Sequence, residues 1–269
     1  MFFRRVFTFF FLIPIAVHAM PINRLPSQLM FQGKQVDPLC LFSIESTTGL
    51  VDLATCGIIS MSGATVSGEN DALISQGFIG YNYRISPHTE GYSYYKSLGT
   101  AGTSVIVQTI NNSGGTGTFS FLNLIQRNGD KINVSVLKGG DRCNGSVVDA
   151  VRLGDHLTYG VQLTPYDVLT LAHDNPHQLK AYDDLSACAT CCVGKAVYQR
   201  VIGHDVADEK LVYLDVSTYL QPADRSSSTQ KYQACFDKLM KEDAIKNKGK
   251  LDFKKILRFT HQFNAQCIS

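Results

Sequence analysis

Residues 118–137 read TFSFLNLIQRNGDKINVSVL, two apolar-rich runs on either side of an Asn-Gly pair. The runs alternate apolar and polar side chains or concentrate β-branched and aromatic residues, as half-buried strands do. An Asn-Gly pair favours a tight hairpin turn. The stretch therefore predicts an antiparallel hairpin from Thr118 to Leu137, the most clearly defined strand pair in the chain.

Further strand-like runs lie on both sides of this hairpin, separated by turn signals such as NNSGGTG at residues 111–117. One short helix is expected between them, with Thr164 as its N-cap and Pro165 in its first turn. The pattern predicts a mainly β fold, an antiparallel sheet of sandwich- or barrel-like form. The runs begin at Cys40, Ala72, Tyr92, Ser104, Leu157, Lys195 and Lys210.

The end of the chain changes from strand-like to helical periodicity after LQPADRSSS, residues 220–228. Two amphipathic runs follow, separated by the charged, Gly-containing turn KNKGK at residues 246–250, and Asp252 is a suitable N-cap for the second run. We therefore expect a β-rich body over residues 20–222 and a C-terminal two-helix hairpin over residues 223–269.

Residues 1–19 have the organisation of a secretory signal peptide. Arg4 and Arg5 form a positive segment, an apolar stretch follows, and Val17 and Ala19 suit a cleavage site before Met20. The apolar stretch is shorter than the ~20 residues that a membrane span requires. We expect an exported protein, periplasmic or secreted, with no transmembrane segment after cleavage.

The charge of the mature chain argues against one class of partner. The full chain has 25 basic and 23 acidic residues, so removing Arg4 and Arg5 leaves 23 of each. Electrostatic binding to nucleic acid depends on a positive excess. No nucleic-acid partner is therefore expected.

The chain has an even number of cysteines, and an oxidising compartment favours their pairing in disulfides. Two pairings are expected from position: one within the N-terminal strands, and one across the helical hairpin. Cys143 is expected to bridge to one member of CATCC at residues 188–192. The other two members of CATCC are expected to bridge to each other. Adjacent cysteines rarely bridge each other, so the expected pairs are Cys40–Cys56, Cys235–Cys267, Cys188 with Cys191 or Cys192, and Cys143 with the one of these two that remains.

CATCC has two other possible uses, metal binding and thiol exchange. A structural zinc site normally brings a second Cys-x-x-Cys pair, which this chain lacks, and the proline between His173 and His177 separates those two side chains. A redox pair normally opens a helix, whereas CATCC precedes a strand-like run. No metal site and no cofactor is therefore predicted.

Other candidate sites carry weaker signals. No nucleophile elbow, metalloprotease helix or phosphate-binding loop occurs, so no catalytic residue is assigned. Acidic pairs at Glu69 with Asp71 and at Asp183 with Asp184 are read as exposed loop residues. N-x-Ser sequences begin at Asn111, Asn133 and Asn144. A tyrosine-rich stretch supplies a possible binding surface, although alternate tyrosines also pack within sheets. Its residues are Tyr81, Tyr83, Tyr92, Tyr94 and Tyr95.

Residues 114–145 and the later segments LTYGVQLTP and CATCCVGKAVYQRV resemble a module of uncharacterised exported bacterial proteins. In that module a Gly-rich turn leads into a Thr-Phe strand, and a paired cysteine precedes the final strand. The resemblance spans residues 114–203 and implies a periplasmic or secreted setting. It implies no activity, substrate or catalytic residue.

These observations predict a disulfide-stabilised, non-enzymatic binding or interaction protein of the cell envelope or extracellular space. Its partner, an envelope or extracellular protein or ligand, is not identified by the sequence. The alternative is an envelope thiol–disulfide oxidoreductase, or a metal-binding protein, that uses Cys188, Cys191 and Cys192.

Overall fold

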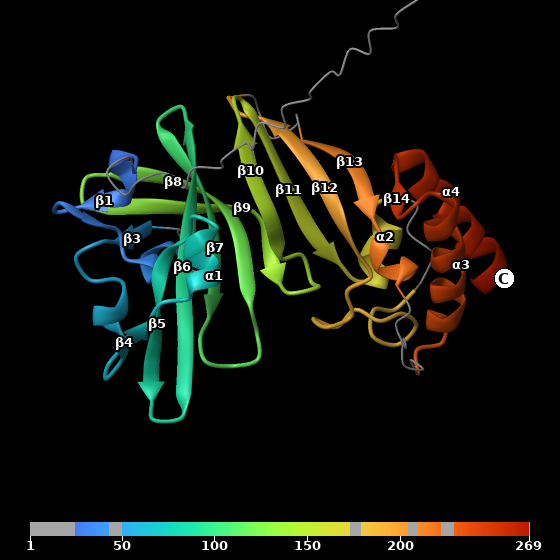
Figure 1. Ribbon diagram of the computed structural model, residues 1–269, viewed down its shortest axis with the longest axis horizontal. Helices are drawn as coiled ribbons and strands as arrows, with labels where there is room; N and C mark the ends of the chain where they lie inside the picture. The colour runs from blue at the N-terminus through green and yellow to red at the C-terminus, as the bar shows by residue number, and fades with distance from the viewer. Residues whose placement is uncertain (1–24, 43–49, 173–178, 204–208, 222–228, 269) are drawn as a thin grey trace, which may run out of the picture.

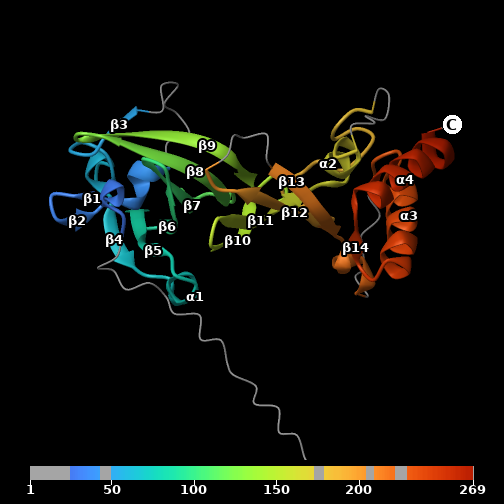
Figure 2. The same cartoon turned by 90° about the horizontal axis from the view of Figure 1, so that it is seen from above.

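The computed structural model describes residues 25–42, 50–172, 179–203, 209–221 and 229–268. The predicted signal peptide, His173, His177 and the predicted boundary at residue 222 lie outside this part of the chain. Three parts follow one another along the long axis of the molecule, a curled seven-stranded sheet, a five-stranded sheet and a pair of helices (Figures 1 and 2).

The seven-stranded sheet is antiparallel throughout, in the order β3-β9-β8-β7-β6-β5-β4. Its central strands are long and joined by short turns, so neighbours in sequence are neighbours in the sheet. The strands are β3 (Leu50–Asp52), β4 (Thr65–Gly68), β5 (Ile79–Ser86), β6 (Thr89–Ala101), β7 (Ser104–Asn112), β8 (Phe119–Asn128) and β9 (Lys131–Asp141).

The predicted hairpin at residues 118–137 is the β8–β9 pair. Asn128 lies opposite Lys131 in the ladder, so the two turn residues are Gly129 and Asp130, one position later than an Asn-Gly turn would place them. Gly129 has φ +59°, a conformation that favours glycine. The hairpin prediction is confirmed, with this shift at the turn.

The five-stranded sheet is also antiparallel, in the order β10-β11-β12-β13-β14. β10 was not predicted. A register shift between Val148 and Val151, with Asp149 at φ +54°, interrupts the two-residue period that identifies a strand in sequence. The strands are β10 (Val147–Leu153), β11 (His156–Leu163), β12 (Gly194–Val201), β13 (Glu209–Asp215) and β14 (Lys250–Leu251).

Two helices, α3 (Gln233–Lys246) and α4 (Phe253–Phe263), form the C-terminal end, and a π-helical turn (Asn264–Ile268) follows α4. The Phe236 ring packs edge-on against Phe259, with centroids 5.2 Å apart. β14 lies between the helices and joins the five-stranded sheet. The helices therefore share one apolar core with that sheet.

N-terminal residues cover one face of the seven-stranded sheet. Leu29, Val36 and Leu41 pack with Val107 and Ile125 of β7 and β8 in a second apolar cluster. This segment contains the two-stranded β1 (Met30–Phe31) and β2 (Lys34–Gln35) and a 3₁₀ turn (Pro38–Leu41).

Two predicted strands begin differently from the expectation. Cys40 lies in the 3₁₀ turn Pro38–Leu41, because Pro38 opens that turn and the Asp37 side chain caps it by accepting from Leu39 N. Ala72 lies in the short helix α1 (Asp71–Ser75), which Asn70 caps by accepting from the backbone N–H groups of Ala72 and Leu73. In both places a side-chain cap outweighs the strand-like composition.

The predicted fold class is confirmed: mainly antiparallel β with C-terminal helices and four disulfides. Within the described ranges, no helix combines the length and the apolar character needed to cross a membrane.

Candidate functional site

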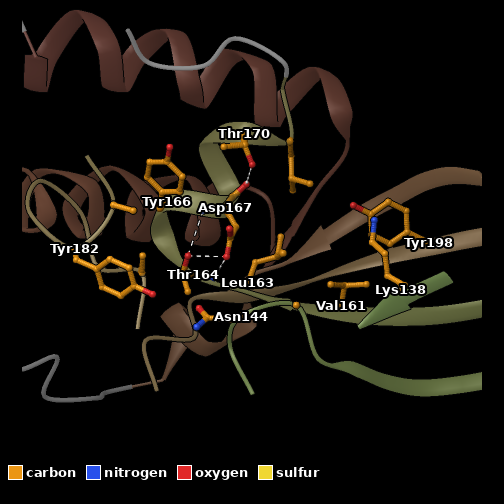
Figure 3. Close-up of a pocket in the computed structure, with 14 residues that line it drawn as sticks. Lys138, Asn144, Val161, Leu163, Thr164, Tyr166, Asp167, Thr170, Tyr182 and Tyr198 are labelled. Atoms are coloured by element: carbon orange, nitrogen blue, oxygen red, sulfur yellow. Dashed lines mark hydrogen bonds between the residues drawn. The ribbon is translucent and has the colours of Figure 1, made fainter. Parts of the chain in front are cut away.

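A pocket of about 600 Å³ lies where the five-stranded sheet meets α2 (Pro165–Thr170) and the loop that precedes β12 (Figure 3). Val161 and Leu163 of β11 form part of its apolar lining. Three tyrosine rings border it, two at one end and one at the other beside a lysine (Figure 3). We call this site the tyrosine pocket; its defining residues are Tyr166, Tyr182, Tyr198, Lys138, Val161 and Leu163.

The wall formed by α2 is held by a capping box. The backbone N–H of Thr164 donates to Asp167 Oδ2 (3.1 Å), the Thr164 hydroxyl donates to the same oxygen (2.7 Å), and Asp167 N donates back to Thr164 Oγ1 (3.3 Å). The expected helix with Thr164 as N-cap is therefore confirmed. Asp167 is committed to this cap, and Lys138 is the other charged residue of the lining.

The far end of the pocket joins the two large sheets. Lys138, on β9, lies 5.0 Å from the ring centroid of Tyr198 on β12, and its Nζ is 3.7 Å from Glu209 Oε1 at the start of β13. Tyr198 stacks on Tyr159 of β11, with centroids 5.7 Å apart, and the Tyr159 hydroxyl donates to Glu209. The pocket therefore ends on a fixed aromatic and ionic arrangement.

Burial keeps the hydroxyls of this arrangement protonated. Burial, and then the charge of Glu209, raise the pKa of Tyr198 to about 12. Burial also raises the pKa of Tyr159, and the hydrogen bond to Glu209 raises it further. At neutral pH both rings present neutral hydroxyl groups.

Two disulfides crosslink the rim of the pocket. Cys143 is bonded to Cys192, and it directly precedes Asn144, which lines the pocket. Cys188 is bonded to Cys191 and follows Ala187, another lining residue. The turn after β9 is thereby tied to the loop before β12, a tie that the Cys143 N–H strengthens by donating to Ala189 O (3.1 Å).

The remaining cysteines pair as expected from the sequence, Cys40 with Cys56 and Cys235 with Cys267. Of the two arrangements left open for CATCC, the structure has Cys188–Cys191 and Cys143–Cys192. A sulfur in a disulfide is not a thiolate and cannot serve as a zinc ligand. Among the described residues no group of three or more His, Cys, Asp or Glu side chains is arranged to hold a metal ion.

The tyrosine-rich stretch is not an exposed surface as a whole. Tyr83, Tyr94 and Tyr95 have at most 1% of their surface exposed, which corrects their assignment to a possible binding surface, and Tyr81 and Tyr92 are half-buried. The hydroxyl of Tyr94 accepts from Asn70 N (2.7 Å) and donates to Asn82 Oδ1 (3.0 Å). These tyrosines build the sheet.

The weaker candidates also have structural roles or lie apart. Asp184 Oδ2 accepts from Lys180 N (2.9 Å) within a turn, and Asp183 is exposed beside it. Glu69 and Asp71 flank the capping residue Asn70 and are near Tyr94. Asn111 is buried, with 1% of its surface exposed, whereas Asn133 on β9 is half-buried and Asn144 is exposed.

Sequence reasoning did not find the tyrosine pocket. Its residues come from β9, β11, α2, the following loop and β12, and single Tyr or Lys residues so far apart form no motif. The one usable signal was cysteine placement, because Cys143, Cys188 and Cys192 adjoin or precede segments that line the pocket.

No family model, curated protein or solved structure matches the chain.

Proposed function

We propose that this chain is an exported, disulfide-stabilised binding protein of the cell envelope or extracellular space, without enzymatic activity, and that the tyrosine pocket is its ligand site. The observation that carries the proposal is the joint occurrence of an apolar, tyrosine-bordered pocket and two disulfides at its rim. Pockets with an apolar lining and a few convergent polar groups are the usual form of small-ligand sites.

The crosslinked rim favours binding because it reduces the ordering that a ligand must impose. The Cys143–Cys192 bond holds the turn after β9 to the loop before β12, and the Cys188–Cys191 bond closes a short turn within that loop, before any ligand arrives. Preorganisation of this kind raises affinity by lowering the entropy lost on binding. A ring-bearing ligand, or a ring on a partner protein, would contact the tyrosines and meet Lys138 at the far end.

The test uses 1-anilinonaphthalene-8-sulfonate, a fluorescent ring compound with an anionic group. We expect saturable, one-to-one binding to the folded protein. Thr170→Trp should weaken that binding at least tenfold, because Thr170 is exposed at the end of α2 and lines the pocket.

Ser75→Trp is the matched control. Ser75 is exposed at the end of α1, and its hydroxyl donates to the carbonyl three residues earlier, as the Thr170 hydroxyl does. The control should bind the probe like the unmodified protein. Equal weakening by both substitutions, or no saturable binding, would contradict the proposal.

A second candidate function is thiol–disulfide exchange at Cys188 and Cys191. Both residues are half-buried rather than fully enclosed, which leaves their bond within reach of a reductant. Equilibration with glutathione buffers distinguishes the two functions. A binding protein should keep this bond in buffers that reduce an exchange enzyme. The double variant Cys188→Ser, Cys191→Ser should still bind the probe, because the Cys143–Cys192 bond continues to join the two segments of the rim.

A further inference from the structure

Four polar side chains lie together on the covered face of the seven-stranded sheet. Ser93 and Tyr95 of β6, Asn111 of β7 and Asn123 of β8 are each at most 2% exposed. Tyr95 belongs to the apolar cluster with which the N-terminal segment covers this face. We call these four residues the polar seam.

The residues of the polar seam are neighbours in the sheet. Ser93 lies directly opposite Asn111, and Tyr95 lies opposite Thr109. Thr109 in turn accepts from Asn123 Nδ2 (3.2 Å) on the next strand. Directly opposed residues of antiparallel strands have side chains close enough to interact, so the seam is continuous across three strands.

Five buried atoms of the seam have no hydrogen-bond partner within the described part of the chain. They are Ser93 Oγ, Tyr95 OH, Asn111 Nδ2, Asn111 Oδ1 and Asn123 Oδ1. The Asn111 side chain is close enough to the Tyr83 hydroxyl to offset part of the rise that burial causes in its pKa, and that hydroxyl donates to the backbone oxygen of Asn112 (3.3 Å). Buried polar groups in folded proteins are nearly always paired with protein or ordered water, because an unpaired one costs its full desolvation penalty.

The opposite face of the same strands shows the contrast. Ser120 on β8 is buried to a similar degree, and its hydroxyl donates to Val147 O (2.6 Å). Gln108 Nε2 on β7 donates to the same carbonyl oxygen (3.0 Å), and Gln108 Oε1 is the one buried atom of these two side chains without a partner in the described part of the chain. There β10 supplies a protein acceptor, whereas on the face that carries the seam apolar side chains of the N-terminal segment pack with Tyr95, Val107 and Ile125.

We infer that the polar seam is an internal hydration site in which ordered water molecules link β6, β7 and β8. The unpaired set contains both donors and acceptors and no charged group, which suits water rather than an ion. On the same face, Phe42 packs against Phe119 and Phe121 of β8. On the other side, Tyr81, opposite Ser93, bonds to Asp37 of the covering segment.

Long-lived internal water can be counted by magnetic relaxation dispersion and located in a high-resolution crystal structure. We expect ordered water within hydrogen-bond distance of Ser93, Asn111 and Asn123, and a loss of at least one long-lived water in Ser93→Ala. Ser120→Ala, the matched substitution on the opposite face, should leave the count unchanged.

The proposal is overturned if the seam atoms pair directly with other protein groups or border a dry gap. It is also overturned if Ser93→Ala and Ser120→Ala give the same water count. Should Ser93→Ala fail to fold, the crystal structure of the unmodified protein decides alone. Neither measurement depends on the tyrosine pocket.

Discussion

Tyr81 of β5 donates a hydrogen bond of 2.6 Å to Asp37, a residue 44 positions earlier in the chain. The same carboxylate accepts from Leu39 N (2.9 Å) and from Ile58 N (3.1 Å). Asp37 therefore joins three parts of the chain: the N-terminal segment that covers the sheet, the 3₁₀ turn that begins at Ile58, and strand β5. The Cys40–Cys56 bond reinforces this junction covalently.

Removing the Tyr81 hydroxyl should weaken this junction. We expect Tyr81→Phe to lower the free energy of unfolding by about 1.5–3 kcal/mol, the usual range for a hydrogen bond to a charged group. Tyr182→Phe is the control, because Tyr182 is 61% exposed. Urea unfolding measures both variants, and equal stability of the two would contradict the role given to Asp37.

Alkaline pH should unfold the protein through its buried tyrosines. Burial is the first cause that raises the pKa of Tyr81, Tyr95 and Tyr159, and it raises that of Tyr198 to about 12. Because the folded pKa lies above the unfolded value of about 10, these groups contribute stability that is fully present below pH ~10 and is lost as pH rises above it.

Absorbance at 295 nm, which reports tyrosinate, follows this transition. We expect some of the 12 tyrosines to ionise near their ordinary pKa and the buried ones only together with loss of the folded circular-dichroism spectrum. A single smooth titration of all tyrosines in a protein that stays folded would contradict the expectation.

The disulfides should differ in their contribution to stability. Cys235–Cys267 separates its ends by 32 residues, and the chain-entropy relation assigns such a loop roughly 3–4 kcal/mol. Cys188–Cys191 separates its ends by 3 residues, and the same relation assigns it roughly 2 kcal/mol. Paired Cys→Ser variants at each site test the order in urea unfolding. A larger loss of unfolding free energy on removal of Cys188–Cys191 would contradict this order.

Intact mass tests export and crosslinking together. The exported protein should begin at Met20, and denaturing reduction should add two hydrogens for each of the four bridges. A chain that retains residues 1–19 would contradict the predicted signal peptide. A gain of fewer than eight hydrogens would mean that one of the bridges is open.

Strands with a regular period were predictable from the sequence, and those with local irregularities were not. The β8–β9 pair was clear because its alternation is unbroken and a turn signal lies between the runs. β10 was not predicted because its bulge interrupts the strand period. α1 was not predicted because the Asn70 side chain caps a helix at the start of a strand-like run. Each of these effects depends on a single residue, and one residue changes the overall composition of a run too little to be detected.

The site was less predictable than the fold. Cysteine pairing by position identified Cys40–Cys56 and Cys235–Cys267. The tyrosine prediction selected the most conspicuous cluster, whereas the pocket tyrosines at residues 166, 182 and 198 are isolated in sequence. Their convergence depends on how α2 and the loop before β12 pack against the five-stranded sheet, which no local pattern encodes.

Adjacent Cys191 and Cys192 belong to different bridges, and β12 begins two residues after Cys192, at Gly194. Pairing Cys143 with Cys191 instead would place the covalent anchor one residue further from the start of β12. A one-residue slip exchanges the two faces of a strand, so Tyr198 would turn away from Tyr159. The Cys143–Cys192 bond thus anchors the chain two residues before β12, the strand whose register with β11 places Tyr198 beside Tyr159.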